Sequence, residues 1–243
     1  MVKNYLVTAL RPISSIREHG DDSINLYLDY QEMYKMSIAS FKHFVEEPFE
    51  TIIWSDPAKD VNSSTYQNWI DIRNLWNSEP CNIFWAGADT LMLKKTKIFS
   101  DRFPEYRMFN YTDPKSHAEV KHYFNDDLRY YPHTMSTDIW QLGEDLFKKR
   151  NEHLEKNWGF DQIRHNAMFW NQSIPDSDRL HPYMAYQAMN LRSLSPEMVQ
   201  WHNNWNGITL DTAHILHFHG SRGSKAVINF MRELCTKLDI IYE

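Results

Sequence analysis

The stretch from Phe84 to Leu93, FWAGADTLML, decides how the fold of the whole chain is interpreted. One apolar run ends in the small residues 86–88, and a second apolar run starts at Thr90. Asp89 therefore stands alone between two hydrophobic segments, where an unpaired carboxylate is costly to bury. Two interpretations stay open. Either a strand ends at a cleft in which Asp89 meets water, a metal or a ligand, or Asp89 caps a turn.

The composition indicates a globular protein, and we expect a single domain over residues 1–243. A hydrophobic fraction of 42% is enough for a sizeable core. The net charge of −6 and the lack of a basic run argue against a nucleic-acid partner. With 7 glycines, a glycine-rich phosphate loop is not expected. The 9 Trp, 13 Tyr and 13 Phe residues can form core, or surfaces that stack on sugars and bases.

Two cysteines, Cys81 and Cys235, are too few for a zinc framework or a disulfide scaffold, which favours a reducing compartment. The apolar stretch from Tyr5 to Leu10 is too short for a signal peptide, because Arg11 follows at once. No apolar run approaches the length of a membrane span. We therefore expect a cytoplasmic protein with no membrane span.

Strand and helix patterns alternate through the first part of the chain. The expected elements are a strand at 5–10, a helix at 27–45, a strand at 49–54, a helix around 69–76 and the strand that leads to Asp89. This order predicts an α/β fold with a mixed, mostly parallel sheet flanked by helices. Ligands of such sheets lie beyond the carboxyl ends of the strands, where Leu10, Ser55 and Asp89 fall.

Patterns are weaker in the middle and return near the end. The expected elements there are strands at 106–111, 122–125 and 213–219, helices at 139–150 and within 151–171, and a last helix at 227–238 with Ser224 as its N-cap.

Histidines mark the expected strand at 213–219. Strand periodicity puts His217 and His219 on one face and His214 on the other. The two imidazoles of one face could bind a metal together, or one could bind a metal while the other meets a ligand. The alternative is that each is satisfied by a hydrogen bond in the core.

A cationic turn, Gly220-Ser221-Arg222-Gly223-Ser224-Lys225, opens the last helix. Free backbone N–H groups and the helix dipole favour an anion there, and Arg222 and Lys225 add positive charge. An ordinary turn with solvated cations is the alternative. Together with Asp89 and His217, the turn provides the parts for a divalent cation that holds a diphosphate, and the imidazole suits Mn²⁺ better than Mg²⁺.

These motifs, in this order, resemble the GT-A fold nucleotide-sugar glycosyltransferases, and within them the retaining family of glycogenin and the bacterial galactosyltransferases. The Asp-x-Asp-Thr-Leu motif of that family is matched by the stretch 87–91, with its second Asp at Asp89 and its first replaced by Gly87. The late His-Phe-x-Gly motif is matched by the stretch 217–220. The resemblance implies a Mn²⁺ or Mg²⁺ ion on Asp89 and His217.

The resemblance also implies a donor site. The base is expected against Thr8, Ala9, Leu10, Arg11 and the strand end at Ser55 and Asp56, and the diphosphate and sugar near Arg73, Ala88, Asn125, His219, Gly220 and Arg222 or Lys225. The small residues that follow the family's motif asparagine are replaced here by Asp126 and Asp127, which predicts a different sugar pocket. Asp161 and Gln162 match the start of an Asp-Gln-Asp motif and would orient sugar and acceptor.

The resulting prediction is a glycosyltransferase that moves a sugar from a nucleotide-diphosphate sugar, expected to be a UDP-sugar, to a carbohydrate or other hydroxyl acceptor. If transfer inverts configuration, Asp161 is the candidate base. Three alternatives remain: a nucleotidyltransferase on a related sheet, a non-catalytic nucleotide- or carbohydrate-binding protein, and a zinc hydrolase that uses His217 and His219.

Overall fold

The computed structural model describes residues 1–10, 22–55, 64–99, 105–111, 124–148, 165, 166, 168, 186–187, 213–218 and 225–243. Its first elements alternate as the sequence predicts. They are β1 (Lys3–Ala9), α1 (Asp22–Phe44), β2 (Glu50–Trp54), α2 (Ser64–Ser78) and β3 (Cys81–Ala86). All six residues of β3 are buried, as expected for a central strand that is covered on both faces.

The main sheet of the described residues has five strands in the order β2-β1-β3-β6-β5. Strand β1 pairs in parallel with both β2 and β3. Strand β6 (Phe124–Tyr131) runs antiparallel to β3 and to β5 (Arg107–Tyr111), so it alone opposes the other four strands of this sheet. The mixed, mostly parallel sheet of the prediction is confirmed. The strand expected at 122–125 is wrong in extent, because pairing with β3 carries β6 on to Tyr131.

A second, three-stranded sheet has the order β4-β8-β7. It contains β4 (Thr90–Met92), β8 (Ile215–His217) and β7 (Tyr186–Gln187). Strand β8 is shorter than the expected strand at 213–219, and its ladder pairs it with the residues just after Asp89. The apolar run after Asp89 is therefore a separate strand in a separate sheet.

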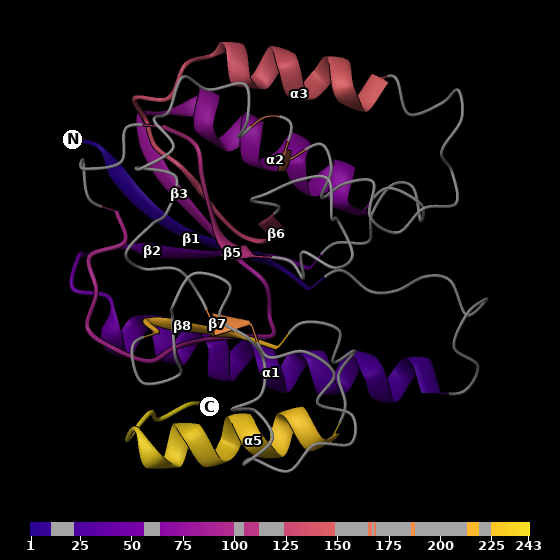
Figure 1. Cartoon of the computed structure of the whole chain (residues 1–243), viewed down its shortest axis with the longest axis vertical. Coiled ribbons are helices and arrows are strands. Elements are labelled where there is room, and N and C mark those ends of the chain that lie inside the picture. The colour runs from indigo at the N-terminus through magenta and orange to yellow at the C-terminus, as the bar shows by residue number, and fades with distance from the viewer. Residues whose placement is uncertain are drawn as a thin grey trace.

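Helices cover both faces of the main sheet (Figure 1). Helices α2 and α3 (Asp138–Lys148) lie over one face, and α1 lies under the other, together with the small sheet and α5 (Lys225–Lys237). The α2 and α3 side is an aromatic core, in which the rings of Tyr131 and Trp140 stack 5.4 Å apart. On the α1 side, the side chains of Ser37 and Ser40 bond to Thr90 Oγ1 and Met92 N, which fixes β4 against the helix.

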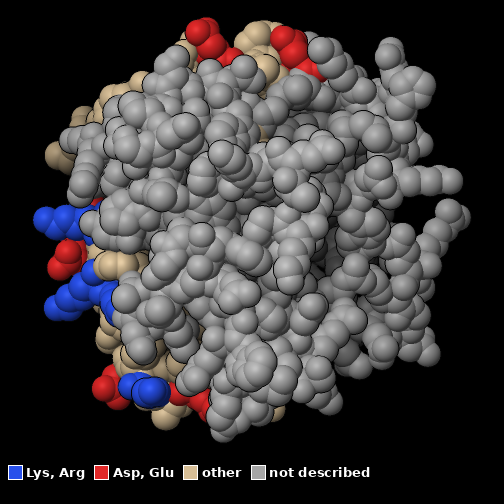
Figure 2. All heavy atoms as spheres, viewed as in Figure 1, with Lys and Arg blue, Asp and Glu red and all other residues tan. Residues whose placement is uncertain are grey.

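The surface of the described residues carries charges of both signs. In the face shown in Figure 2, Lys and Arg side chains lie beside Asp and Glu side chains along the left-hand edge. Within the described ranges, no helix combines the length and apolar character needed to cross a membrane.

We expect Gly143→Ala, in α3, to destabilise the fold. Alanine ordinarily favours a helix over glycine by about 1 kcal/mol. Here the added Cβ would lie 2.7 Å from Trp69 Cζ2 and 3.1 Å from Met168 Sδ. The ring of Trp69 is buried against that of Trp140 and cannot move freely. The steric cost of overpacking should therefore exceed the gain in helix propensity. We expect a loss of roughly 1–3 kcal/mol in the free energy of unfolding, measured in urea.

The matched control is Gln141→Ala on the exposed side of the same helix, which should change stability by less than about 0.5 kcal/mol. A Gly143→Ala protein more stable than the unaltered one would contradict the packing argument.

Candidate active site

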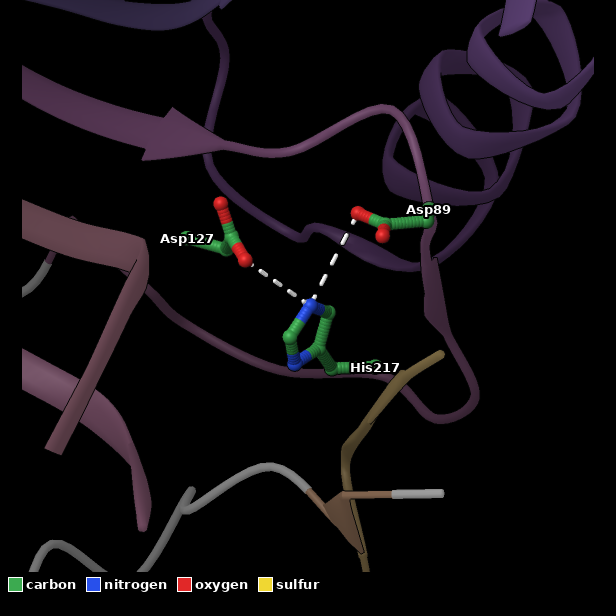
Figure 3. Close-up of side chains that lie close together, drawn as sticks. All are labelled: Asp89, Asp127 and His217. Atoms are coloured by element: carbon green, nitrogen blue, oxygen red, sulfur yellow. Dashed lines mark ion pairs between the residues drawn. The ribbon is translucent and has the colours of Figure 1, made fainter. Parts of the chain in front are cut away.

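Two carboxylates and one imidazole converge where the two sheets meet (Figure 3). Asp89 follows the end of β3, Asp127 lies in β6, and His217 ends β8. His217 Nε2 lies 3.1 Å from Asp127 Oδ2 and 3.7 Å from Asp89 Oδ1. The imidazole is fully buried, whereas Asp127 keeps 41% of its side chain exposed. The group is therefore anchored inside the protein and open on the Asp127 side.

Backbone hydrogen bonds hold the three segments together. Gly87 N donates to Asp127 O at 2.9 Å, which ties the turn after β3 to β6. Phe218 N donates to Asp89 O at 2.9 Å, and Thr90 pairs with His217 in the β4–β8 ladder. The Thr90 hydroxyl also donates to the Gly87 carbonyl at 2.7 Å, which tightens the turn itself. Each of the three segments is thus fixed by its main chain.

The carboxylate of Asp89 lies in surroundings that disfavour its ionised form. The pKa of Asp89 is raised from 3.8 to about 6, chiefly by burial; His217 opposes this shift and the neighbouring Asp127 carboxylate adds to it. A carboxylate that resists ionisation in this way is stabilised by a cation placed beside it. The electrostatics of the site therefore favour a bound positive charge.

The donor set suits a divalent cation. One ligand atom from each of Asp89, Asp127 and His217 can be chosen so that all lie within 4.8 Å of one another. Ligands that each lie about 2.1 Å from one ion are separated by roughly 3 to 4 Å, so small side-chain shifts would close a site here. Two oxygens and an imidazole nitrogen match Mn²⁺ well and Mg²⁺ acceptably.

The predicted donor-site residues divide into those that the structure describes and those that it does not. Thr8, Ala9 and Leu10 lie at the carboxyl end of β1, where Leu10 N bonds to Trp54 O at 2.9 Å, and Ala88 lies in the turn beside Asp89. The two predicted metal ligands, Asp89 and His217, are brought together. The residues outside the described ranges are Arg11, Asp56, Asp161, Gln162, His219, Gly220 and Arg222.

Three further predicted residues have described positions. Arg73 pairs with Glu144 of α3, and its guanidinium lies 5.1 Å from the centre of the Trp69 ring, so it is engaged between the helices. Lys225 is the first residue of α5, and Asn125 lies in β6 opposite Asn110. A role for these three toward a donor stays a prediction.

His214 was expected to face away from His217. Its Nδ1 lies 2.5 Å from Thr96 Oγ1, and burial lowers its pKa. It therefore contributes to the packing between β8 and the segment after β4, and not to the group around His217.

Asp127 is the member of this group that the sequence did not predict as a metal ligand. Its local signal was weaker than that of Asp89, because Asp126 and Arg129 interrupt the hydrophobic residues around Asp127. The residue of this stretch that matches the family motif is Asn125. Only the antiparallel pairing of β6 with β3 brings Asp127 beside Gly87.

Comparisons with known proteins identify the fold. No protein-family model matches the sequence, and no curated protein matches it. The fold itself is that of the GT-A glycosyltransferases, as the sequence resemblance predicted.

Two solved structures resemble the chain over nearly its whole length. A glycosyltransferase involved in the glycosylation of the major capsid of PBCV-1 has a TM-score of 0.52 and 13% identity, covering 95% of this chain and 99% of that one. An active-site mutant of LgtC has a TM-score of 0.50 and 10% identity, with 98% of each chain covered. At such identities the likeness is one of fold.

We expect Asp89→Asn to stabilise the metal-free protein at neutral pH. The folded-state pKa of Asp89, about 6, lies above its ordinary value of 3.8, so the folded chain holds the proton more tightly. Stability is therefore lost as pH rises between those two values, and the cost is complete above the folded pKa. The amide removes that cost, and unfolding in urea with EDTA near pH 8 should show a gain of roughly 1–3 kcal/mol.

Near pH 4 the gain should shrink, because Asp89 is then protonated in the folded protein. Glu233→Gln, an exposed change of the same charge on α5, is the control and should show no such pH dependence. An Asp89→Asn protein less stable than the unaltered chain near pH 8 would contradict the electrostatic argument.

Proposed function

We propose that the chain is a metal-assisted glycosyltransferase that moves a sugar from a nucleotide-diphosphate sugar to a hydroxyl acceptor. The observation that carries the proposal is the convergence of Asp89, Asp127 and His217. It lies beyond the carboxyl end of a parallel strand, where α/β sheets bind ligands, in a fold similar to that of a solved glycosyltransferase. The donor we propose is a UDP-sugar, and the acceptor a carbohydrate or another hydroxyl compound.

The side chains of the group would hold Mn²⁺ or Mg²⁺. When bound, the cation neutralises negative charge that develops on a departing nucleoside diphosphate. The buried His217 and the turn that carries Asp89 are fixed before any ligand arrives, because backbone bonds hold both segments. Such preorganisation means that little of the binding energy is spent on arranging the ligands.

The rest of the donor site follows from the chain around this group. The start of α5 at Lys225 comes a few residues after His217, and helix N-termini favour anions. We propose that Lys225, with Arg222, holds the diphosphate, and that His219 and Gly220 approach it. The base would lie at the carboxyl ends of β1 and β2, against 8–11 and Asp56, as Thr8 to Leu10 already line the first of these ends.

For the acceptor side we propose Asp161 and Gln162 as the residues that orient sugar and acceptor, on the sequence resemblance alone. The same applies to Arg73, Ala88 and Asn125 toward the sugar. We further propose that residues 1–243 act as one domain in the cytoplasm.

The proposal predicts that one nucleoside diphosphate or nucleotide sugar will stabilise the protein only when Mn²⁺ is present. At a ligand concentration of about one hundred times its dissociation constant, the gain is roughly 2.7 kcal/mol. For a chain of this size that gain corresponds to a rise in Tm of roughly 5–10 °C. A thermal-shift panel of nucleotides and their sugars, with and without Mn²⁺, measures this effect and identifies the base.

In Asp89→Asn, the metal-dependent part of the shift should disappear while the fold persists, and Glu233→Gln should keep it. Product analysis then distinguishes the classes, since a glycosyltransferase releases nucleoside diphosphate and a nucleotidyltransferase releases pyrophosphate. A panel without any metal-dependent shift, or full transfer by Asp89→Asn, would contradict the proposal.

A further inference from the structure

Gly87 lies against the two carboxylates of the candidate metal centre. A Cβ placed on it would be 2.8 Å from Asp89 Oδ1, 3.3 Å from Asp127 Cβ and 3.6 Å from Asp127 Cγ. The φ angle of Gly87 is outside the left-handed region, so the backbone would accept a side chain. Space, and not backbone conformation, is therefore what makes glycine suitable here.

The β3–β6 ladder explains why residues 87 and 127 share this space. The ladder pairs Trp85 with Arg129 and Ala86 with Leu128, and the Gly87 N to Asp127 O bond continues the register by one step. Residues at directly opposite positions of an antiparallel pair ordinarily have Cβ atoms about 5 Å apart, and the 3.3 Å from an added Cβ on Gly87 to Asp127 Cβ is shorter still. A carboxylate on either residue would thus enter one region beside Asp89.

We infer that Gly87 and Asp127 form a matched pair, in which the absence of a side chain at 87 leaves room for the Asp127 carboxylate to serve as the second acidic ligand. The inference rests on the proposed metal-dependent function for the cation itself. It assigns to β6 a ligand that the Asp89 turn does not supply. The centre then draws its three side chains from three segments: the turn after β3, β6 and β8.

The matched pair implies that a carboxylate is tolerated at position 87 or at position 127, but not at both. Carboxylates at 87 and 127 together would place two like charges on opposite strand positions, beside the third carboxylate of Asp89. One carboxylate, at either position, supplies the second acidic ligand of the candidate metal centre. Moving the carboxylate from 127 to 87 should therefore restore the Mn²⁺ affinity that is lost when it is removed from 127. The side chain of Asp89 can rotate, so its Oδ1 can shift slightly and make room at position 87.

The test is a swap that keeps net charge constant. The proteins are the unaltered chain, Asp127→Gly, Gly87→Asp and the double variant Gly87→Asp/Asp127→Gly, with Asp127→Asn as a variant that keeps the shape of the side chain and Glu233→Gln as the charge control. Mn²⁺ affinity is measured by titration calorimetry and by electron paramagnetic resonance of the free ion. Stability without metal is measured in urea with EDTA.

We expect Asp127→Gly and Asp127→Asn each to weaken Mn²⁺ binding by at least about tenfold, since even the outer partners of metal ligands are worth that much. Glu233→Gln should bind as the unaltered chain does. Gly87→Asp alone should lower metal-free stability and should not strengthen Mn²⁺ binding. The swap should recover most of the affinity lost in Asp127→Gly and most of the stability lost in Gly87→Asp, a strong positive coupling between the two positions.

If the changes in Mn²⁺ affinity and in stability at positions 87 and 127 simply add in the double variant, the matched pair is overturned. Tighter Mn²⁺ binding by Gly87→Asp would overturn it as well. If Asp127→Gly and Asp127→Asn bind Mn²⁺ normally while Asp89→Asn does not, the proposed metal dependence stands on Asp89 and His217, and the inference falls. If the unaltered chain binds no Mn²⁺, both fall.

Discussion

The short turn between β3 and β4 is the constraint on which the rest of the site depends. Its Gly87 N–H bonds to the carbonyl of Asp127 in the main sheet, and the carbonyl of Asp89 accepts from Phe218, which follows β8. Three residues of chain thereby join the main sheet to the small one. Because α1 also fixes β4 through its serine hydroxyls, the turn has little freedom to relax. The positions of all three candidate ligands follow from these main-chain bonds.

This rigid junction stores an electrostatic cost. Two carboxylates lie beside a fully buried imidazole, and burial raises the pKa of Asp89 to about 6. A protein selected for stability alone would not need this arrangement, since an amide at position 89 removes the cost. The cost becomes useful when a cation binds, because the cation then meets ligands that are already in place. The site thus carries a local electrostatic cost within a well-packed frame, as functional sites commonly do.

The alternation of elements in the first half was predictable because local periodicity carries it. Tyr34, Ile38 and Phe41 repeat at helical spacing in α1, and β3 is short and apolar apart from Asn82. Strand β6 was predicted too short, because polar residues interrupt its pattern and only pairing with β3 and β5 extends it. Strand β4 was not expected at all. Its three residues have no periodicity of their own and become a strand only when they meet β8.

The sequence by itself determined that Asp89 and His217 were candidate ligands, since a carboxylate in an apolar run and an imidazole in a strand are unusual enough to be noticed. It also indicated the α/β order that places Asp89 at the end of a strand. Tertiary structure alone decided that Gly87 and Asp127 belong to one site. In the sequence each looked like a departure from a motif, and they lie 40 residues apart. An antiparallel register sets them opposite one another, and register depends on partners that no local pattern reveals.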